Sequence, residues 1–492
     1  MANHWAEWST KKGPRSGGAR RPPSDRAGPA GTLSRRCTTS TESRNPAPPD
    51  SRLRRTTALC VAAASVEWYD FFLYATASAT VFADLYFGAL GPTAATLASF
   101  ATFALAFVAR PLGGVVFGFL GDRAGRKVAL AAGTVTMGVS TTLIGLLPPY
   151  ASIGVAAPIL LTALRLVQGL ALGGQWAGSV LLLTEQAPAG RRGFFGSLAQ
   201  LGSPIGGIVS NALFFLLSAV LSPAQFSAWG WRIPFLLSVA FVGLGLYVQL
   251  RLEESPAFRR IAGAGDRSRT PIVEVLRTRP VQVLLAAGAF VAASASLYVF
   301  VTYLLQYAPT VLKVPKQTIL LLVTATQAFQ MASIPLASAM SDRIGRRRVY
   351  LTAAAASAVW AFPAFWLIDT GSVGLIVLAL SVAHLVLGAM YGPLAAMFSE
   401  MFGTRVRYSG ASLGYQLGTV VGGGFAPIIA TSLFAATGTS ASISGYLVVV
   451  SLITLVAVAL VRDTSSMDTT AEGARGDEDR GSAVSPSGDH RL

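Results

Sequence analysis

Two acidic residues lie inside a long uncharged stretch near the start of the chain. Glu67 and Asp70 belong to VEWYDFFLY, residues 66–74. A charged aspartate at the centre of a membrane helix costs roughly 2.5–3.5 kcal/mol, so such residues usually face a bundle interior and serve a function. Because Glu67 and Asp70 are three residues apart, they share one helical face, with Tyr74 one turn further on.

That face suggests proton coupling at Glu67 and Asp70. A carboxyl group in a partly dry site whose water access alternates can exchange a proton near neutral pH. The alternative is a buried salt bridge that only sets the register of the helix.

Arginines inside other apolar stretches are candidate partners for these acids or for a substrate. Arg110 lies roughly 15 Å, and Arg165 roughly 10 Å, from the nearer end of its expected span. A guanidinium keeps its charge in a protein, so each needs a carboxylate, a set of carbonyls or an anionic ligand. Substrate or proton-site contact and purely structural pairing both remain open for Arg110 and Arg165.

Several uncharged polar residues inside the apolar stretches are further candidates for substrate contact. Each could instead form an ordinary hydrogen bond between helices, and His384 could also titrate. Together with Tyr74, Arg110 and Arg165, the candidate substrate-binding residues are Gln168, Gln175, Gln200, Tyr303, Gln327, His384 and Gln416.

The elements that must position these residues are membrane helices. The chain is 52% hydrophobic and only 13% charged, and its apolar residues come in blocks of about 20 or more, enough to cross a bilayer. We expect twelve spans, near 58–86, 93–120, 128–148, 158–186, 194–221, 232–251, 280–308, 316–341, 348–368, 373–400, 408–435 and 441–461.

The basic residues predict the orientation of these spans. Arginine and lysine gather in alternate connections, for example at 123–127, 251–279 and 343–348, whereas the opposite connections hold little more than Lys313 and Lys316. Because cytoplasmic loops carry the positive charge, both termini are predicted to be cytoplasmic.

Other function classes fit the composition poorly. No basic, aromatic-bearing soluble domain suggests nucleic-acid binding, despite the net charge of +16. Cys37 and Cys60 have no metal-ligand spacing, and no nucleophile–base constellation or phosphate loop appears, so we expect no metal, no cofactor and no enzyme. Residues 1–55 lack the apolar core of a cleaved signal and should be disordered.

An internal repeat divides the apolar part in two. GDRAGRK from Gly121 and SDRIGRRR from Ser341 occupy the same place in each set of six spans. A second match recurs in the same order: Arg191, Gln200, Leu201, Gly202, Gly206 and Gly207, then Arg407, Gln416, Leu417, Gly418, Gly422 and Gly423.

The repeat predicts an all-α membrane protein with twelve transmembrane helices in two parallel six-helix halves, which suits rocking about a site between them. We expect a disordered arm (1–55), an N-terminal half (56–251), a cytoplasmic linker (252–279), a C-terminal half (280–461) and a disordered tail (462–492).

The duplicated Asp-Arg-x-Gly-Arg loops could form a cytoplasmic latch as well as serving as a topology signal. Asp122 and Asp342 can meet the positive ends of helices, while Arg126 and Arg346 can reach Glu185 and Glu400. The candidate gate residues are Asp122, Arg123, Arg126, Glu185, Asp342, Arg343, Arg346 and Glu400.

Glycines four residues apart in the eleventh span predict close helix packing. They are Gly410, Gly414, Gly418 and Gly422.

The motifs together resemble one family. The loops and RLVQGLALGG from Arg165 are similar to signatures of the major facilitator superfamily, and WYDFFLY, ARPLGG, TEQAPAGRRG, GWRIPF and ESPAF resemble its metabolite:H⁺ symporter branch. The resemblance implies uptake of a small polar metabolite with protons, by a monomer in the inner membrane of a bacterium. One departure is Gln175, which stands where the family usually has glutamate and which cannot hold or release a proton.

The resemblance leaves the substrate open. An organic acid fits the embedded arginines best. The alternatives are a zwitterionic osmolyte such as proline or betaine, an uncoupled facilitator or exporter, and a membrane sensor that binds a ligand without transporting it.

Overall fold

The computed structural model describes residues 50–124, 126–173, 175–188, 190–251, 271–402 and 407–461. They all belong to one compact unit, Pro48–Leu492. The predicted disordered arm and tail, and the linker residues 252–270, lie outside the described ranges almost entirely.

Every element in these ranges is a helix. In the N-terminal half they are α1 (Asp50–Thr80), α2 (Phe82–Phe87), η1 (Gly88–Leu90), α3 (Pro92–Ala124), α4 (Arg126–Leu146), α5 (Tyr150–Ile153), α6 (Ala156–Ala171), α7 (Gln175–Gln186), α8 (Arg192–Leu198), η2 (Ala199–Leu201), α9 (Gly202–Val220), α10 (Pro223–Gln225), η3 (Phe226–Gly230) and α11 (Arg232–Arg251). In the C-terminal half they are α13 (Pro271–Thr278), α14 (Pro280–Tyr298), η4 (Val299–Tyr303), α15 (Leu304–Thr310), α16 (Lys316–Ile344), α17 (Arg346–Ile368), α18 (Val373–Met401), α19 (Arg407–Thr419), η5 (Val420–Gly424), α20 (Ala426–Thr437) and α21 (Ala441–Leu460).

The predicted spans reappear, with breaks that their apolar composition did not indicate. Within the described residues, ten helical stretches are long and apolar enough to cross a membrane, and the pair Pro223–Gly230 and Arg232–Val248, bent by 42°, gives an eleventh. The shorter α6 and α7 occupy the expected fourth span, 158–186. The apolar pattern is therefore that of a multi-pass membrane protein.

The fourth span was predicted as one helix, and the structure corrects this. Helix α6 ends at Ala171, and α7 begins at Gln175. A Cβ at Gly173 would lie 2.2 Å from the backbone oxygen of Arg110 and from the nitrogen of Gly114. Only glycine allows α3 to approach the break this closely.

The seventh and eleventh spans are each interrupted by one π-helical segment. These are η4 between α14 and α15, and η5 between α19 and α20. Such segments inside α-helices frequently mark functional positions.

The predicted glycine packing in the eleventh span is confirmed at three of its four positions. Added Cβ atoms at Gly414, Gly418 and Gly422 would lie 2.4–2.6 Å from atoms of α14. Gly410 instead lies against the ring of Phe402.

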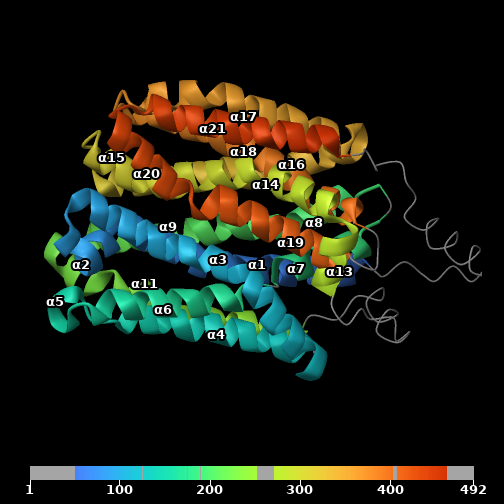
Figure 1. Ribbon diagram of the computed structural model, residues 1–492, viewed down its shortest axis with the longest axis horizontal. Coiled ribbons are helices and arrows are strands. Elements are labelled where there is room, and N and C mark those ends of the chain that lie inside the picture. Colours follow the sequence, from blue (N-terminus) through green and yellow to red (C-terminus); the bar gives the residue numbers. More distant parts are fainter. Residues whose placement is uncertain are drawn as a thin grey trace, which may run out of the picture. The chain divides into compact units, whose positions relative to one another are not determined.

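The helices of each half pack mainly with one another. Figure 1 shows α1–α11, in blue to green, grouped apart from α14–α18 and α21, in yellow to red. The two groups meet where α9 contacts α16, where α8 contacts α16 and α18, and where α3 contacts α19, η5 and α20.

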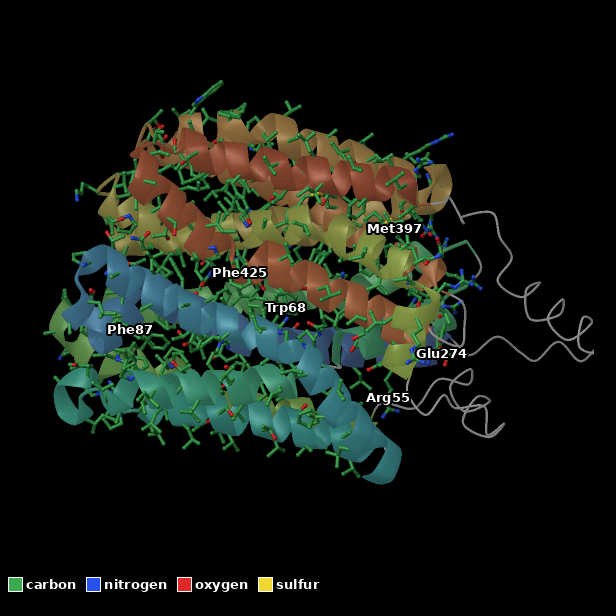
Figure 2. All side chains as sticks on the ribbon, in the orientation of Figure 1. Arg55, Trp68, Phe87, Glu274, Met397 and Phe425 are labelled. Atoms are coloured by element: carbon green, nitrogen blue, oxygen red, sulfur yellow. The ribbon has the colours of Figure 1, made fainter. Side chains whose placement is uncertain are left out.

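Figure 2 shows where labelled residues lie along these helices. Arg55, Glu274 and Met397 lie toward one end, Phe87 lies near the other, and Trp68 and Phe425 lie between them. We call the end that holds the α16–α17 turn (343–348) and Met397 the basic end; it is the predicted cytoplasmic side.

Candidate functional site

Two arginines meet on one aromatic ring between the halves. Arg165, on α6, is fully buried, and its Cζ lies 3.9 Å from the ring centroid of Tyr74 and 5.0 Å from that of Phe71. The Cζ of Arg110, on α3, lies 4.5 Å from the centroid of Phe71. Cation–π attraction thus holds both guanidinium groups against α1.

The C-terminal half covers this arrangement with a tyrosine. The ring centroid of Tyr298, on α14, lies 5.8 Å from that of Phe71 and 5.4 Å from those of Phe103 and Phe107. We call the group of Arg110, Arg165, Phe71, Phe103, Phe107 and Tyr298 the arginine–aromatic cluster. Its members come from both halves, as a site for alternating access requires.

Several polar atoms of this cluster lack hydrogen-bond partners among the described residues. They are Nε of Arg110, Nε and Nη2 of Arg165 and the hydroxyl of Tyr298. Arg165 donates through Nη1 to Oε1 of Gln168 at 2.6 Å. Buried, incompletely bonded guanidinium groups can bind a carboxylate through charge-assisted hydrogen bonds.

Asp70 directly precedes Phe71 on α1 and is hydrogen-bonded within the N-terminal half. Its two carboxylate oxygens accept hydrogen bonds from Ser238 on α11 at 2.8 Å and from Thr141 on α4 at 3.0 Å. Thr141 in turn accepts from Nε2 of Gln168 at 2.8 Å. A hydrogen-bonded chain therefore links Asp70 through Thr141 and Gln168 to Arg165.

Glu67 has different surroundings from Asp70. It is half-buried and lines a narrow pocket with Trp68, Trp176 and Gln200 among others. The structure therefore places the two acids, which were predicted to share one face, in two separate environments. Their coupling role stays a prediction.

An aromatic stack closes the interface nearer the basic end. The rings of Trp176 on α7 and Tyr415 on α19 are parallel within 7°, with centroids 3.9 Å apart. Nε1 of Trp176 donates to Oε1 of Gln200 at 2.8 Å, and Gln416 donates to the backbone oxygen of Gly173 at 3.3 Å. Gln200 also donates through Nε2 to the backbone oxygen of Tyr391 on α18 at 3.5 Å, so Gln200 and Gln416 both bond across the interface.

The other predicted contact residues lie at varied places. Tyr74 shares a hydrogen bond of 2.6 Å with Thr102. Tyr303 lies toward the end opposite the basic end and stacks on Tyr307. The hydroxyl of Tyr307 donates to Asp369. Gln327 and His384 are buried, and each has one polar atom without a partner in the described part of the chain. The side chain of Gln175 lies outside that part.

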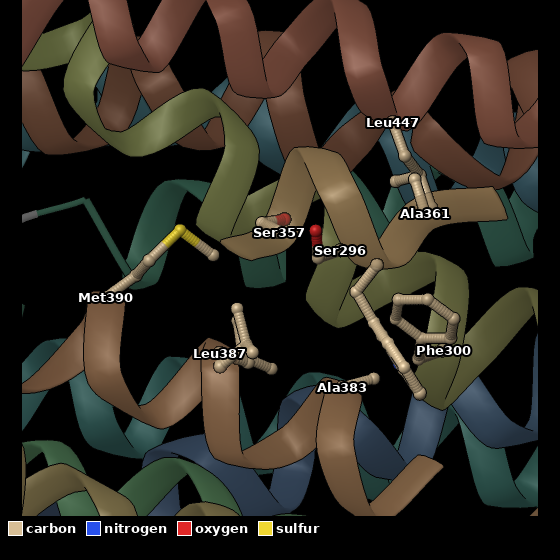
Figure 3. Close-up of a pocket in the computed structure, with 10 residues that line it drawn as sticks. Ser296, Phe300, Ser357, Ala361, Ala383, Leu387, Met390 and Leu447 are labelled. Atoms are coloured by element: carbon tan, nitrogen blue, oxygen red, sulfur yellow. The ribbon is translucent and has the colours of Figure 1, made fainter. Parts of the chain in front are cut away.

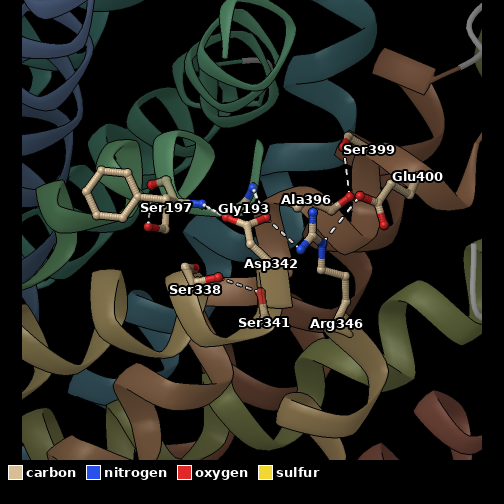
Figure 4. Close-up of polar contacts among 10 residues, drawn as sticks. Gly193, Ser197, Ser338, Ser341, Asp342, Arg346, Ala396, Ser399 and Glu400 are labelled. Atoms are coloured by element: carbon tan, nitrogen blue, oxygen red, sulfur yellow. Dashed lines mark hydrogen bonds and ion pairs between the residues drawn. The ribbon is translucent and has the colours of Figure 1, made fainter. Parts of the chain in front are cut away.

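One of the two predicted latch loops is described, and it connects the halves (Figure 4). Asp342 accepts from the backbone nitrogens of Gly193 and Phe194 at the start of α8, both at 2.9 Å. Arg346 contacts Asp342 at 2.6 Å and Glu400 at 3.4 Å. A carboxylate at a helix N-terminus is stabilised by the backbone dipole.

The remaining gate candidates contribute no described contact. Glu185 and Arg343 are exposed. The side chains of Asp122, Arg123 and Arg126 lie outside the described ones.

A separate pocket lies within the C-terminal half (Figure 3). It is lined mainly by apolar side chains, including Phe300, Leu387, Met390 and Leu447. It contains none of the predicted site residues.

Sequence reasoning missed the residues that organise the site. Thr141 and Ser238, the partners of Asp70, were not among the candidate residues, although Thr141 lies in MGVSTTLIGLLPPY, a stretch that also resembles the symporter branch. The aromatic residues carried a signal, because Phe71 lies within WYDFFLY and Trp176 directly follows Gln175.

The chain matches two family models that together cover most of its length. Residues 56–282 match "Sugar (and other) transporter", and residues 285–486 match "Major Facilitator Superfamily".

Curated relatives align over most of both chains. The inner membrane metabolite transport protein YhjE of Escherichia coli (strain K12) is 41% identical, with 81% of this chain and 92% of the relative covered. The shikimate transporter of the same strain is 38% identical (84% and 95% covered), and its proline/betaine transporter is 32% identical (85% of each).

Solved structures support the fold. The proton:xylose symporter XylE bound to 6-bromo-6-deoxy-D-glucose has a TM-score of 0.66 at 16% identity, covering 86% of this chain and 99% of that one. A partially occluded inward-open form of the xylose transporter XylE from E. coli has a TM-score of 0.63 at 18% identity, covering 85% and 99%. The twelve-helix architecture expected from the repeat is therefore confirmed. The chain belongs to the major facilitator superfamily, among its metabolite transport proteins.

Proposed function

We propose that this transporter imports a small organic acid together with protons, across the inner membrane of a bacterium and by alternating access. The observation that carries the proposal is the pair of buried arginines between the halves, whose Nε atoms have no described partner. An anionic cargo would supply the missing acceptors and offset part of the positive charge of the two guanidinium groups.

Binding would occur where Arg110 and Arg165 approach the ring of Phe71. A carboxylate there can accept from both guanidinium groups while Tyr298 covers it from the other half. Because water is largely excluded by the surrounding rings, each charge-assisted hydrogen bond is stronger than it would be in solvent.

Proton coupling would follow from competition for Arg110. Arg110 contacts the ring of Phe71, one helical turn from Glu67 on α1, and so brings a fixed positive charge near this carboxylate. A cargo carboxylate that binds Arg110 weakens the effect of this charge, so Glu67 would take up a proton more readily. Asp70 is linked to Arg165 through Thr141 and Gln168 and could respond to cargo in the same way.

Alternating access would use contacts at both ends of the interface. Asp342 holds α8 near the basic end, and Lys316 donates to the backbone oxygen of Thr80 at 3.2 Å near the other end. Breaking one set while keeping the other would open the site to one side at a time.

A zwitterionic osmolyte is the second candidate cargo. It is favoured by the relatives named proline/betaine transporter and by the many aromatic rings, which attract quaternary ammonium groups. Two nearby guanidinium groups would repel such a cation, so we place this candidate second.

Counterflow into proteoliposomes distinguishes these cargoes. We expect organic acids to exchange and an inward proton gradient to drive their accumulation. Arg165→Lys should reduce exchange at least about tenfold, because lysine cannot reproduce the stacked planar group. The matched control is Arg348→Lys, at an exposed position outside the candidate gate residues. The proposal would be contradicted if betaine exchanged and organic acids did not. It would also be contradicted if accumulation did not depend on the proton gradient.

A further inference from the structure

The hydroxyl of Thr141, on α4, has two acceptors for its single hydrogen. Its Oγ1 lies 3.0 Å from Oδ2 of Asp70 on α1 and 3.0 Å from the backbone oxygen of Met137 on its own helix. Because a hydroxyl donates only one hydrogen bond, it makes one of these two bonds at a time.

Neighbouring hydroxyls on α4 differ from Thr141 in this respect. Ser140 donates to the backbone oxygen of Thr136, and Thr142 donates to that of Gly138, both at 2.8 Å. Each has this one acceptor among the described residues, and such bonds to the oxygen four residues earlier are ordinary for hydroxyls inside helices. The second acceptor of Thr141 is instead a carboxylate on another helix.

In the ionised state of Asp70, both carboxylate oxygens accept from hydroxyls. Ser238 donates to Oδ1 at 2.8 Å, and Thr141 donates to Oδ2. Oγ1 of Thr141 also accepts from Nε2 of Gln168 at 2.8 Å. Hydrogen bonds to an ionised acceptor are charge-assisted, so these two donors stabilise the carboxylate inside the N-terminal half.

The same side chains can bond the protonated acid without a change of position. When Oδ2 takes up a proton from the aqueous phase, its new O–H can donate to Oγ1 of Thr141, whose own hydrogen then turns to the oxygen of Met137. Oγ1 then donates one hydrogen bond and accepts two, from Asp70 and from Gln168, which is the full capacity of a hydroxyl. Asp70 gains one proton, and no other group gains or loses one.

The burial of Asp70 makes such an acceptor necessary. The acid is 1% exposed, so bulk water supplies no partner for its added hydrogen, and an unmade bond there is costly. If Ser238 accepted that hydrogen, its own would lose its acceptor, because the oxygen of Pro234, four residues earlier, already accepts from Tyr69 at 2.7 Å. The second acceptor that Ser238 lacks is the oxygen of Met137 in the case of Thr141.

The charges around Asp70 are independent of this hydroxyl. In the described part of the chain, α4 carries no ionisable side chain apart from its first residues, and the exposed Tyr247 lies on α11. The other ionisable side chains on the helices around Asp70 are Glu67, Tyr69 and Tyr74 on α1, Arg110 on α3, Arg165 on α6 and Arg232 on α11. A substitution at Thr141 therefore removes a donor and leaves these groups in place.

We infer that Thr141 is a positioning residue for proton uptake, whose hydroxyl turns between Asp70 and the oxygen of Met137 so that both protonation states of the buried acid are fully hydrogen-bonded. A hydroxyl that donates to a carboxylate is also a stronger acceptor than one that donates to a carbonyl. The charge on Asp70 therefore acts on Arg165 through Thr141 and Gln168. This inference rests on the proposed function, in which Asp70 is a coupling acid.

Infrared titration of the purified full-length protein in lipid tests the inference without any cargo. The C=O stretching band of a protonated carboxyl group grows as an acid takes up its proton, and the part of this signal that Asp70→Asn removes belongs to Asp70. Hydrogen bonds to a charged group are stronger than those of a neutral acid, so loss of the Thr141 donor weakens the ionised state more. Thr141→Val should therefore raise the pH at the midpoint of the Asp70 signal by about one unit, a tenfold gain in proton affinity.

Further substitutions separate the hydroxyl from the shape of the side chain. Thr141→Ser keeps the hydroxyl and should titrate as the unaltered protein does. Thr141→Cys, whose thiol is a weak donor, should raise the midpoint by less than valine does and serves as the second variant if the valine protein does not fold. Thr142→Val is the matched control and should leave the midpoint unchanged, since that hydroxyl bonds only to its own helix among the described residues.

The outcomes separate the inference from the function on which it rests. A midpoint that does not rise in Thr141→Val or Thr141→Cys overturns the inference and leaves the proposed function standing. An equal rise in Thr141→Ser or in Thr142→Val assigns the effect to packing and also overturns it. If Asp70→Asn removes no part of the carboxyl signal, the inference and the coupling role of Asp70 are both contradicted, while counterflow of organic acids still tests the proposed cargo.

Discussion

Glu67 and Asp70, the two acidic residues of the first span, have different surroundings. Asp70 is fully enclosed and accepts from two hydroxyls, whereas Glu67 lines a narrow pocket formed by α1, α7 and η2. A proton that must exchange with water reaches Glu67 more directly, and one at Asp70 would act on the cargo through the chain to Arg165. Neutralising substitutions at the two acids should therefore have different effects on transport.

Asp70→Asn should abolish uphill, proton-driven accumulation and leave part of the counterflow. An asparagine can keep the hydrogen bond to Thr141 or Ser238 but cannot take up a proton. Uptake by proteoliposomes under an inward proton gradient, compared with counterflow at equal pH, measures both. Normal uphill uptake by the variant would refute the coupling role of Asp70. Glu67→Gln in the same assay then tests whether Glu67 has the coupling role instead.

Gln175→Glu should be tolerated and should steepen the pH dependence of uptake. The substitution restores the carboxylate that the family usually has after its fourth-span motif, and a carboxylate can titrate where glutamine cannot. The measurement is the initial rate of uptake between pH 5.5 and 8. A pH profile identical to that of the unaltered protein would make position 175 a packing site.

At the scale of helices, glycine decides how closely α3 and α6 approach. A Cβ at Gly169 would lie 2.4 Å from the backbone oxygen of Ala106, and one at Gly113 would lie 1.9 Å from that of Leu170. Arg110 and Arg165 stand on these two helices, so the same contact that packs the helices also brings the guanidinium groups to one ring.

Gly169→Ala should lower the free energy of unfolding by about 1–3 kcal/mol, because backbone atoms must move to admit the methyl group. Gly445→Ala on α21 is the matched control: nothing lies within 4 Å of its Cβ, and alanine in a helix is favoured over glycine by roughly 0.5–1 kcal/mol. Thermal unfolding of the purified variants compares them. Equal melting temperatures would show that α3 and α6 separate at no cost.

The span pattern was predictable from the sequence because hydropathy and helix length are local properties. The same holds for the glycine stripe from Gly414 to Gly422, whose four-residue spacing indicates close packing. The breaks at Val81, at Gly173 and in η4 and η5 were not predictable, since each depends on which backbone lies opposite. For the same reason, spacing alone placed Glu67 and Asp70 on one face but could not separate their partners on α4, α7 and α11.

At the scale of the whole molecule, the halves are held at both ends and in the middle. Asp342 bonds α8 near the basic end, Trp176 stacks on Tyr415, and Gln317 donates to the backbone oxygen of Ser218 toward the other end. Contacts on both sides of the arginines are what a carrier needs, since a path open at both ends would dissipate the gradient. In the state described, the halves contact each other on both sides of the arginines.

The Asp342 latch should set the balance between the states open to each side. Its carboxylate accepts two backbone hydrogen bonds and forms an ion pair with Arg346. Each hydrogen bond to a charged group contributes about 1.5–3 kcal/mol to stability. Asp342→Asn should therefore shift the population toward the state open at the basic end by about tenfold or more. Transport should slow, because the return step then has to rebuild the weakened contact.

Labelling of one introduced cysteine measures this shift. Ser179 lines the narrow pocket beside Glu67, on the basic-end side of the arginines. In a Ser179→Cys protein without Cys37 and Cys60, Asp342→Asn should raise the rate of reaction with a membrane-impermeant maleimide about tenfold in inside-out vesicles. Arg348→Gln, at a nearby exposed position outside the candidate gate residues, should leave that rate unchanged. Equal rates with and without Asp342 would show that the latch does not bear on access. Faster labelling from the opposite side of the membrane would instead reverse the predicted orientation, in which the basic end is cytoplasmic.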